Sequence, residues 1–195
     1  MKIINDSFCL ESEPFIPNDT NRPTVLVLAL IHPGPNILLV RPVNADPSAW
    51  MPPQGGIEDG ESILGAALRE LQEELGYGVD VFLSGQARSL CIGVGQPYMA
   101  EPRKTYYCIT LPMKHWVTPP FVNQDENDDF ITVGSPYELW SRVHCCSQSK
   151  VRLISTCIAE ASKKKLLYGD VWCHSKINMI HGYMNRGNDL VYVGA

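Results

Sequence analysis

Three glutamates, Glu70, Glu73 and Glu74, have the spacing of one face of a helix. At about 3.6 residues per turn, positions i, i+3 and i+4 are neighbours on the helix surface. Like charges at these spacings repel and destabilise a helix by roughly 0.2–0.5 kcal/mol per pair. A hard cation between the carboxylates would offset this repulsion, and ligands that are all oxygen favour Mg²⁺ or Mn²⁺ over Zn²⁺. The spacing alone is typical of a solvated acidic face of a surface helix, and a divalent metal site is the alternative that the surrounding residues must decide.

The helix that carries these glutamates is expected to run from about Glu61 to Leu75. A stripe of apolar residues lies opposite the acidic face and is expected to face the core: Leu64, Ala67, Leu68, Leu71 and Leu75. Gly76 is placed to end the helix in a left-handed turn.

The residues around this helix form an ordered pattern, G-x5-E-x7-R-E-U-x-E-E-x-G, where U is a bulky apolar residue. It is matched at Gly55, Glu61, Arg69, Glu70, Leu71, Glu73, Glu74 and Gly76. At ordinary residue frequencies a chance match at a given position is on the order of 10⁻⁹. The pattern is the Nudix box, and the sequence resembles the Nudix hydrolase family.

This resemblance implies an α/β (α+β) fold, an α-β-α sandwich with a mixed sheet and a loop-helix-loop formed by the box. It implies that the carboxylates of Glu70, Glu73 and Glu74, together with the Gly55 carbonyl, coordinate divalent ions. It also implies structural roles for Glu61, Arg69 and Gly76. The expected activity is Mg²⁺-dependent hydrolysis of a nucleoside diphosphate linked to a group X, with Mn²⁺ as a substitute ion.

The segment before the box, from Trp50 to Ile57, resembles the branch that contains RNA 5′-pyrophosphohydrolases and dinucleoside polyphosphate hydrolases. The expected substrate-binding residues are Arg22, Arg41, Gln54, Lys104 and Tyr106. Arg41 in particular is expected to contact a substrate phosphate or base rather than to bridge surface carboxylates. Hydrolysis of another nucleotide, such as a (d)NTP or ADP-ribose, and a non-catalytic nucleotide-binding Nudix module remain the alternatives.

An acidic segment, 125–129, holds a further candidate for catalysis. The resembling enzymes carry another glutamate between their late strands, and counting back from Phe130 places it at Glu126. This carboxylate would accept a proton from the attacking water. Asp125 and Asp128 are the reserve candidates, and the alternative is a turn of solvated acids.

Strand and helix signals alternate along the rest of the chain. Strands are expected at 24–31, 37–41, 79–83, 89–94, 106–111 and 130–133, a loop over 42–60, an acidic turn over 118–129, and a second helix over 151–165. The Pro/Gly turn at 32–36 predicts that the first two strands pair. Residues 1–21 are expected to be a lead-in, 22–165 the Nudix domain, and 166–195 a C-terminal extension, with a short strand possible at 190–193.

The formal charge of −5 argues against a protein that binds duplex nucleic acid through its phosphates. The expected partner is instead a nucleotide or an RNA 5′ end, and a homodimer is also possible. Seven cysteines without metal-ligand spacing predict reduced thiols rather than a zinc site or a disulfide framework. The absence of a long apolar run predicts no membrane span, and the acidic start of the chain predicts the cytoplasm.

Overall fold

A computed structural model describes residues 23–31, 36–43, 45–75, 88–94, 104–113, 127–143, 146, 148–167 and 172. The strands in these ranges are β1 (Thr24–Ile31), β2 (Asn36–Pro42), β3 (Gln54–Gly56), β4 (Arg88–Val94), β5 (Lys104–Met113) and β6 (Asn127–Val133). The helices are α1 (Ile63–Leu75), α2 (Pro136–Val143) and α3 (Gln148–Lys163).

The strands form one mixed sheet in the order β4-β5-β1-β2-β6, with β3 paired to β1. β1 runs parallel to β5 along its whole length, while its other edge is shared between two strands. β3 pairs with the start of β1, where Thr24 faces Gly56, and β2 pairs with its end, where Leu30 faces Ile37. The predicted pairing of the first two strands is confirmed.

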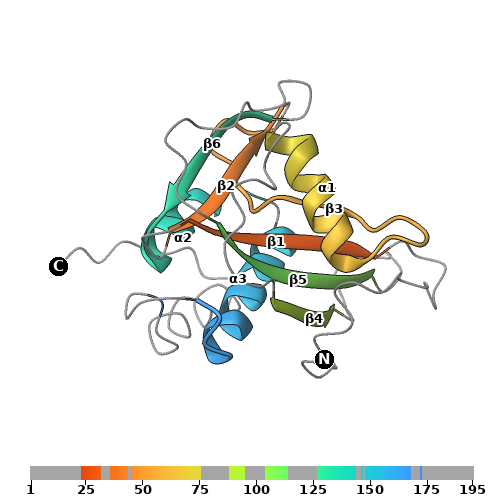
Figure 1. Cartoon of the computed structure of the whole chain (residues 1–195). Helices are drawn as coiled ribbons and strands as arrows, with labels where there is room; N and C mark the ends of the chain where they lie inside the picture. The colour runs from red at the N-terminus through yellow and green to blue at the C-terminus, as the bar shows by residue number, and fades with distance from the viewer. Residues whose placement is uncertain are drawn as a thin grey trace.

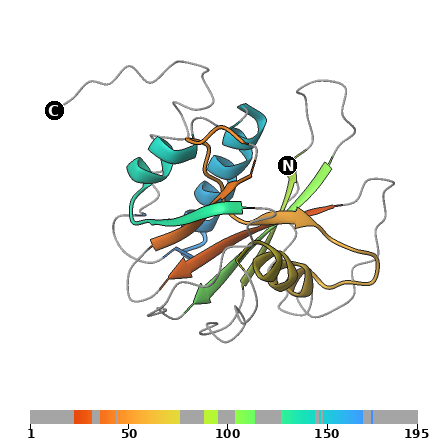
Figure 2. The ribbon, with the colours of Figure 1, turned by 90° about the horizontal axis from the view of Figure 1, so that it is seen from above.

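Helices cover both faces of the sheet, which explains why every residue of β1 is buried. Leu26, Leu28 and Leu30 contribute to the core on the side of α2 and α3, whereas the alternate residues Val25 and Val27 face α1. Figures 1 and 2 show α1 on one side of the strands and α2 with α3 on the other. The predicted α-β-α sandwich is therefore confirmed.

α1 begins at Ile63, two residues later than the expected start at Glu61. Ser62 is the N-cap: its Oγ accepts a hydrogen bond of 2.9 Å from the Gly65 amide. Because Ser62 is the N-cap, Glu61 lies in the loop before the helix, where its carboxylate binds Arg69 and the Glu58 amide.

Two segments expected to be loop or turn are strands. Gln54–Gly56, within the expected loop 42–60, pairs with β1, and Asn127–Asp129, within the expected acidic turn, begins β6. Neither segment has an apolar alternation that would signal a strand. Each becomes a strand because a longer neighbouring strand, β1 or β2, offers it a backbone edge to pair with. Tertiary pairing has overridden local propensity in these two places.

α2 was not expected, although its signal is present in the sequence. Ser135 is its N-cap, with its Oγ 3.1 Å from the amide of Glu138, and Pro136 occupies the first helical position. The carboxylate of Glu138 reaches back to the Gly134 amide at 2.8 Å. Ser-Pro-Tyr-Glu is therefore a capping-box sequence.

α3 begins and ends earlier than the expected range 151–165. Its last turn closes when the amides of Leu166 and Lys165 donate to the carbonyls of Ala161 and Ser162 at 2.8 and 2.9 Å. This pair of hydrogen bonds requires a left-handed backbone at Lys165, whose φ is 57°. Leu166, Leu167 and Trp172, placed in the expected C-terminal extension, are buried in the core on the α3 side.

The strands expected at 79–83 and 190–193 lie outside the described residues. Among the helices that the structure describes, none is long and apolar enough to cross a membrane.

We predict that Lys165→Gly raises the free energy of unfolding by about 1 kcal/mol, because glycine adopts a left-handed backbone without the steric penalty of a Cβ. Urea denaturation followed by circular dichroism measures this difference. Lys165→Ala is the control, since it removes the same charge but keeps the Cβ. Equal stability of the two variants would contradict the prediction.

Candidate active site

The guanidinium of Arg69 joins α1 to the loop that precedes it. Its Nε and Nη2 donate to Oε1 and Oε2 of Glu61 at 3.0 and 3.1 Å, which is a two-pronged ion pair. Nη2 also donates to the carbonyl of Gly56 at 2.7 Å. One side chain therefore fixes the start of α1 against both the loop and the end of β3.

The same guanidinium contacts two of the three glutamates of the acidic face. Nη1 donates to Oε1 of Glu70 at 2.7 Å and to Oε2 of Glu73 at 2.9 Å. Hydrogen bonds to Glu61 and, next, to Glu70 raise the pKa of Arg69 above its usual range. The positive charge of Arg69 thus offsets part of the repulsion expected among the glutamates.

The loop before α1 is folded by the other contacts of Glu61. Its Oε2 accepts the amide of Glu58 at 3.0 Å, and its own amide donates to the Glu58 carbonyl at 3.0 Å. Gly60 lies within this turn with φ of 78°, a conformation that favours glycine. Glu61 therefore holds the loop closed and binds Arg69 with the same carboxylate.

Glu70 is buried, and its carboxylate lies directly against the backbone of Gly55. A Cβ at position 55 would lie 1.9 Å from Cδ and 1.9 Å from Oε1 of Glu70. No side chain larger than hydrogen fits there while Glu70 keeps this position. Gly55 is thus required by the close approach of a carboxylate.

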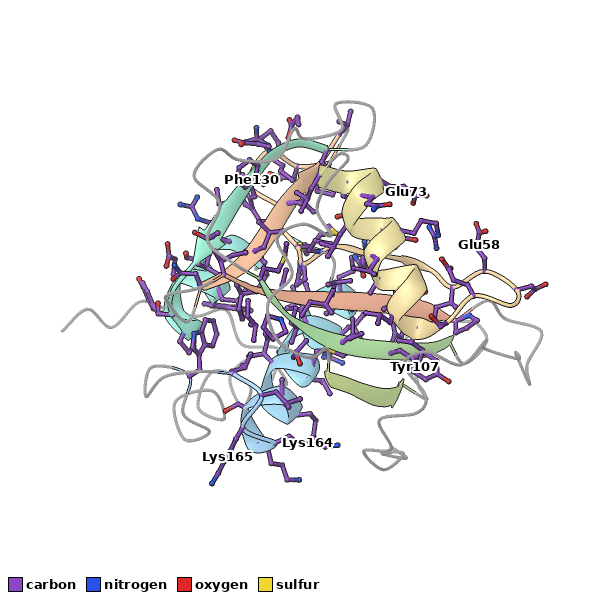
Figure 3. The ribbon with its side chains drawn as sticks, viewed as in Figure 1. Glu58, Glu73, Tyr107, Phe130, Lys164 and Lys165 are labelled. Atoms are coloured by element: carbon purple, nitrogen blue, oxygen red, sulfur yellow. The ribbon has the colours of Figure 1, made fainter. Side chains whose placement is uncertain are left out.

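Glu74 is also buried and contacts β3, whereas Glu73 is nearer to solvent. Oε1 of Glu74 accepts a hydrogen bond of 3.2 Å from the Gln54 amide. The side chain of Glu73 is 43% exposed, and Figure 3 shows it on the outer side of α1. Two carboxylates are therefore held beside β3, and the third borders the solvent.

This donor set is suited to a hard divalent cation, because it consists of carboxylate oxygens beside the backbone of Gly55. Within the ranges that the structure describes, however, no three acidic, histidine or cysteine side chains are gathered closely enough to hold an ion. Oε1 of Glu70 and Oε2 of Glu73 are instead bound by Arg69, so a cation would compete with Nη1 for these two oxygens.

Arg41 bridges two surface carboxylates, so the expectation that it would not do so is wrong. Its Nε lies 2.6 Å from Oδ1 of Asp128, and Nη2 lies 3.7 Å from Oδ2 of Asp129. The hydrogen bond that Arg41 donates to Asp128 raises the pKa of Arg41. Its guanidinium also lies over Trp50, 5.0 Å from the ring centre. The pairing follows from the register of β2 and β6, in which Arg41 faces Asp129.

Of the other predicted substrate residues, the structure describes some, and the rest lie outside the described residues. The amide nitrogen of the Gln54 side chain lies 3.1 Å from Sδ of Met51. Tyr106 is partly buried and packs against the core on the α3 side. Arg22, Gly76, Glu126 and the side chain of Lys104 lie outside the described residues.

The chain matches the NUDIX domain over residues 20–135, more than half of its 195 residues. It belongs to the Nudix family. The predicted resemblance is confirmed, and the box lies where α1 meets β3 and the preceding loop.

Matches to named proteins are shorter than this Nudix domain. Nudix hydrolase 25 of Arabidopsis thaliana is 70% identical over 30 residues, which are 15% of this chain and 17% of that protein. RNA pyrophosphohydrolase of Novosphingobium aromaticivorans is 43% identical over 60 residues, which are 31% of this chain and 37% of that protein. The chain thus covers well under half of the length of either relative. The solved structure of a C. elegans Ap4A hydrolase is 18% identical, over 72% of this chain and 99% of that one, with a TM-score of 0.46.

We predict that Gly55→Ala lowers kcat at least tenfold, because the new methyl group must displace the Glu70 carboxylate. The melting temperature should change little, since the displaced atoms are the end of a flexible side chain. Hydrolysis of a nucleotide substrate with excess Mg²⁺ and a thermal melt measure the two effects.

Gly134→Ala is the matched control. A Cβ there would also press on a side-chain oxygen, Oδ1 of Asn36 at 2.9 Å, but in a different part of the fold. Its activity should be that of the parent protein. Equal activity of all three proteins would contradict the importance of the Gly55–Glu70 contact.

Proposed function

We propose that this Nudix protein is a metal-dependent pyrophosphohydrolase that acts on an RNA 5′ end or on a dinucleoside polyphosphate. The observation that carries the proposal is the placement of the Glu70 carboxylate against Gly55, beside Glu74. The name of the Novosphingobium relative, RNA pyrophosphohydrolase, supports the choice of substrate. Cys108, Cys146 and Cys157 are not in disulfides, which agrees with action in the cytoplasm.

The proposed metal ligands are the carboxylates of Glu70, Glu73 and Glu74 and the carbonyl of Gly55. Bound Mg²⁺, or Mn²⁺ in its place, would polarise pyrophosphate oxygens and lower the pKa of an attacking water. Binding of the ion would require Glu70 and Glu73 to exchange Nη1 of Arg69 for the metal, while Arg69 and Glu61 keep the loop, β3 and α1 in fixed positions. Such preorganisation is the main contribution of a protein to phosphoryl transfer.

Glu126 is proposed to accept the proton of the attacking water. It directly precedes β6, whose first residue Asn127 faces Pro42 of β2. Of the reserve candidates, Asp128 already accepts a hydrogen bond from Arg41. That contact makes Asp128 a weaker choice than Glu126 or Asp125 for a general base.

Arg41 is proposed to bind substrate together with Arg22, Gln54, Lys104 and Tyr106. The guanidinium would have to exchange Asp128 for a substrate phosphate, and the Asp128 side chain is 52% exposed. An ion pair that solvent can reach contributes little to stability, so a doubly charged phosphate can displace it. Trp50 would continue to support the flat side of the guanidinium.

The substrate is tested by hydrolysis of a panel that contains triphosphorylated RNA, diadenosine tetraphosphate, deoxynucleoside triphosphates and ADP-ribose, with and without Mg²⁺. Highest kcat/KM for one of the first two supports the proposal. Highest kcat/KM for ADP-ribose or a deoxynucleoside triphosphate would overturn the substrate assignment. No metal-dependent turnover of any of them would overturn the activity.

We predict that Glu73→Gln and Glu74→Gln each lower kcat by two or more orders of magnitude, because a lost charged ligand removes several kcal/mol of transition-state stabilisation, roughly 3–4 kcal/mol. Each variant should also bind Mn²⁺ more weakly, as measured by calorimetry. Without metal, Glu73→Gln should change the free energy of unfolding by less than about 1 kcal/mol, because its ion pair with Arg69 is partly exposed.

Asp59→Asn is the control for these variants, because it removes one exposed charge from the loop before α1 without touching the proposed ligands. Its turnover and Mn²⁺ affinity should match the parent protein. Parent-like turnover in both glutamine variants would remove the acidic face of α1 from the reaction.

A further inference from the structure

Two cationic or polar donors from distant parts of the chain contact one sulfur atom. Nζ of Lys150 lies 3.4 Å from Sδ of Met51, and Nε2 of Gln54 lies 3.1 Å from the same atom. A thioether is a weak acceptor for either group. Both donors can therefore leave the sulfur for an anionic oxygen at little cost.

The charge of Lys150 is not compensated by a neighbouring acid in the described part of the chain. The ion pairs recorded there are made by Arg41 and Arg69, and Lys150 is in none of them. The first turn of α3, where Lys150 lies, contains no acidic residue. A cation in that turn is disfavoured by the helix dipole. An anion beside Lys150 would relieve this disadvantage.

The backbone of β3 connects these donors to the proposed metal ligands. The backbone amide of Gln54 donates to Glu74 at 3.2 Å, and the following residue, Gly55, contacts the Glu70 carboxylate. Met51 belongs to the core on the α3 side, whereas α1 packs on the opposite face of the sheet. The three-residue strand β3 therefore has the carboxylates on one side and the Lys150–Gln54 donors on the other.

We infer that Lys150 and Gln54 bind a phosphate beyond the two that flank the hydrolysed bond. The inference rests on the proposed function and narrows its substrate class to chains of three or more phosphates. A phosphate chain that passes β3 meets the carboxylates and then the two donors. A substrate with only two phosphates, such as ADP-ribose, has no further phosphate to place there.

The first experiment compares kcat/KM of Lys150→Ala on a 5′-triphosphorylated oligonucleotide and on ADP-ribose. The variant should lose about ten- to one-hundred-fold on the triphosphate, the range for a hydrogen bond to a charged group. It should change less than twofold on ADP-ribose, and Lys150→Arg should recover most of the loss. An equal effect on both substrates, or none on the triphosphate, would overturn the inference.

Lys163→Ala is the matched control, because it removes an exposed lysine from the opposite end of the same helix, about 20 Å away. Figure 3 shows the adjoining Lys164 and Lys165 at this end, far from Glu73 on α1. The control variant should keep the parent kcat/KM on both substrates. A loss equal to that of Lys150→Ala would mean that only net charge matters, and the inference would be wrong.

A binding measurement separates this inference from the proposed function. Calorimetry without metal compares inorganic tripolyphosphate and pyrophosphate on the parent protein, Lys150→Ala and Lys163→Ala. Tripolyphosphate should bind at least tenfold more tightly to the parent and the control than to Lys150→Ala, with a smaller difference for pyrophosphate. If the parent hydrolyses nothing but this difference is present, the proposed activity fails and the phosphate site stands. If tripolyphosphate does not distinguish the proteins, the phosphate site fails.

Discussion

The contacts of one guanidinium determine how this site is assembled. Arg69 binds the carboxylate of Glu61, the carbonyl of Gly56 and the carboxylates of Glu70 and Glu73. These groups come from the loop, the end of β3 and α1, and the side chains of Glu61 and Arg69 are largely protected from water. Charge-assisted hydrogen bonds are stronger in such partly buried surroundings than at the surface. Because the three segments meet at Arg69, the position of Glu70 beside Gly55 depends on it.

The sequence was most informative where structure follows from local spacing. α1 and its acidic face were predictable because periodicity, the cap at Ser62 and the box all lie within one continuous segment. The strand at β1 was signalled by its nearly continuous apolar run, and its pairing with β2 by the Pro/Gly turn between them. These features need no information about residues far along the chain.

Features that depend on distant pairing were not predictable. β3 is three residues long and exists because β1 offers it a backbone edge, while Arg41 meets Asp128 through the register of β2 and β6. Lys150 and Met51 are separated by 99 residues, and nothing in either local sequence indicates their contact. α2 is a different case, because the capping sequence that begins at Ser135 was present and could have been recognised.

The acidic face of α1 illustrates how a helix can carry three neighbouring carboxylates without a bound cation. Three like charges at these spacings would oppose helix formation, but Nη1 of Arg69 contacts two of them and the Gln54 amide contacts the third. Arg69 is also anchored by Glu61 and Gly56 through its other nitrogens, so losing the contacts of Nη1 would leave it in place. One side chain therefore joins the loop, β3 and α1 and also offsets the repulsion along the acidic face. The closure of the loop and the charge balance of the helix depend on the same residue.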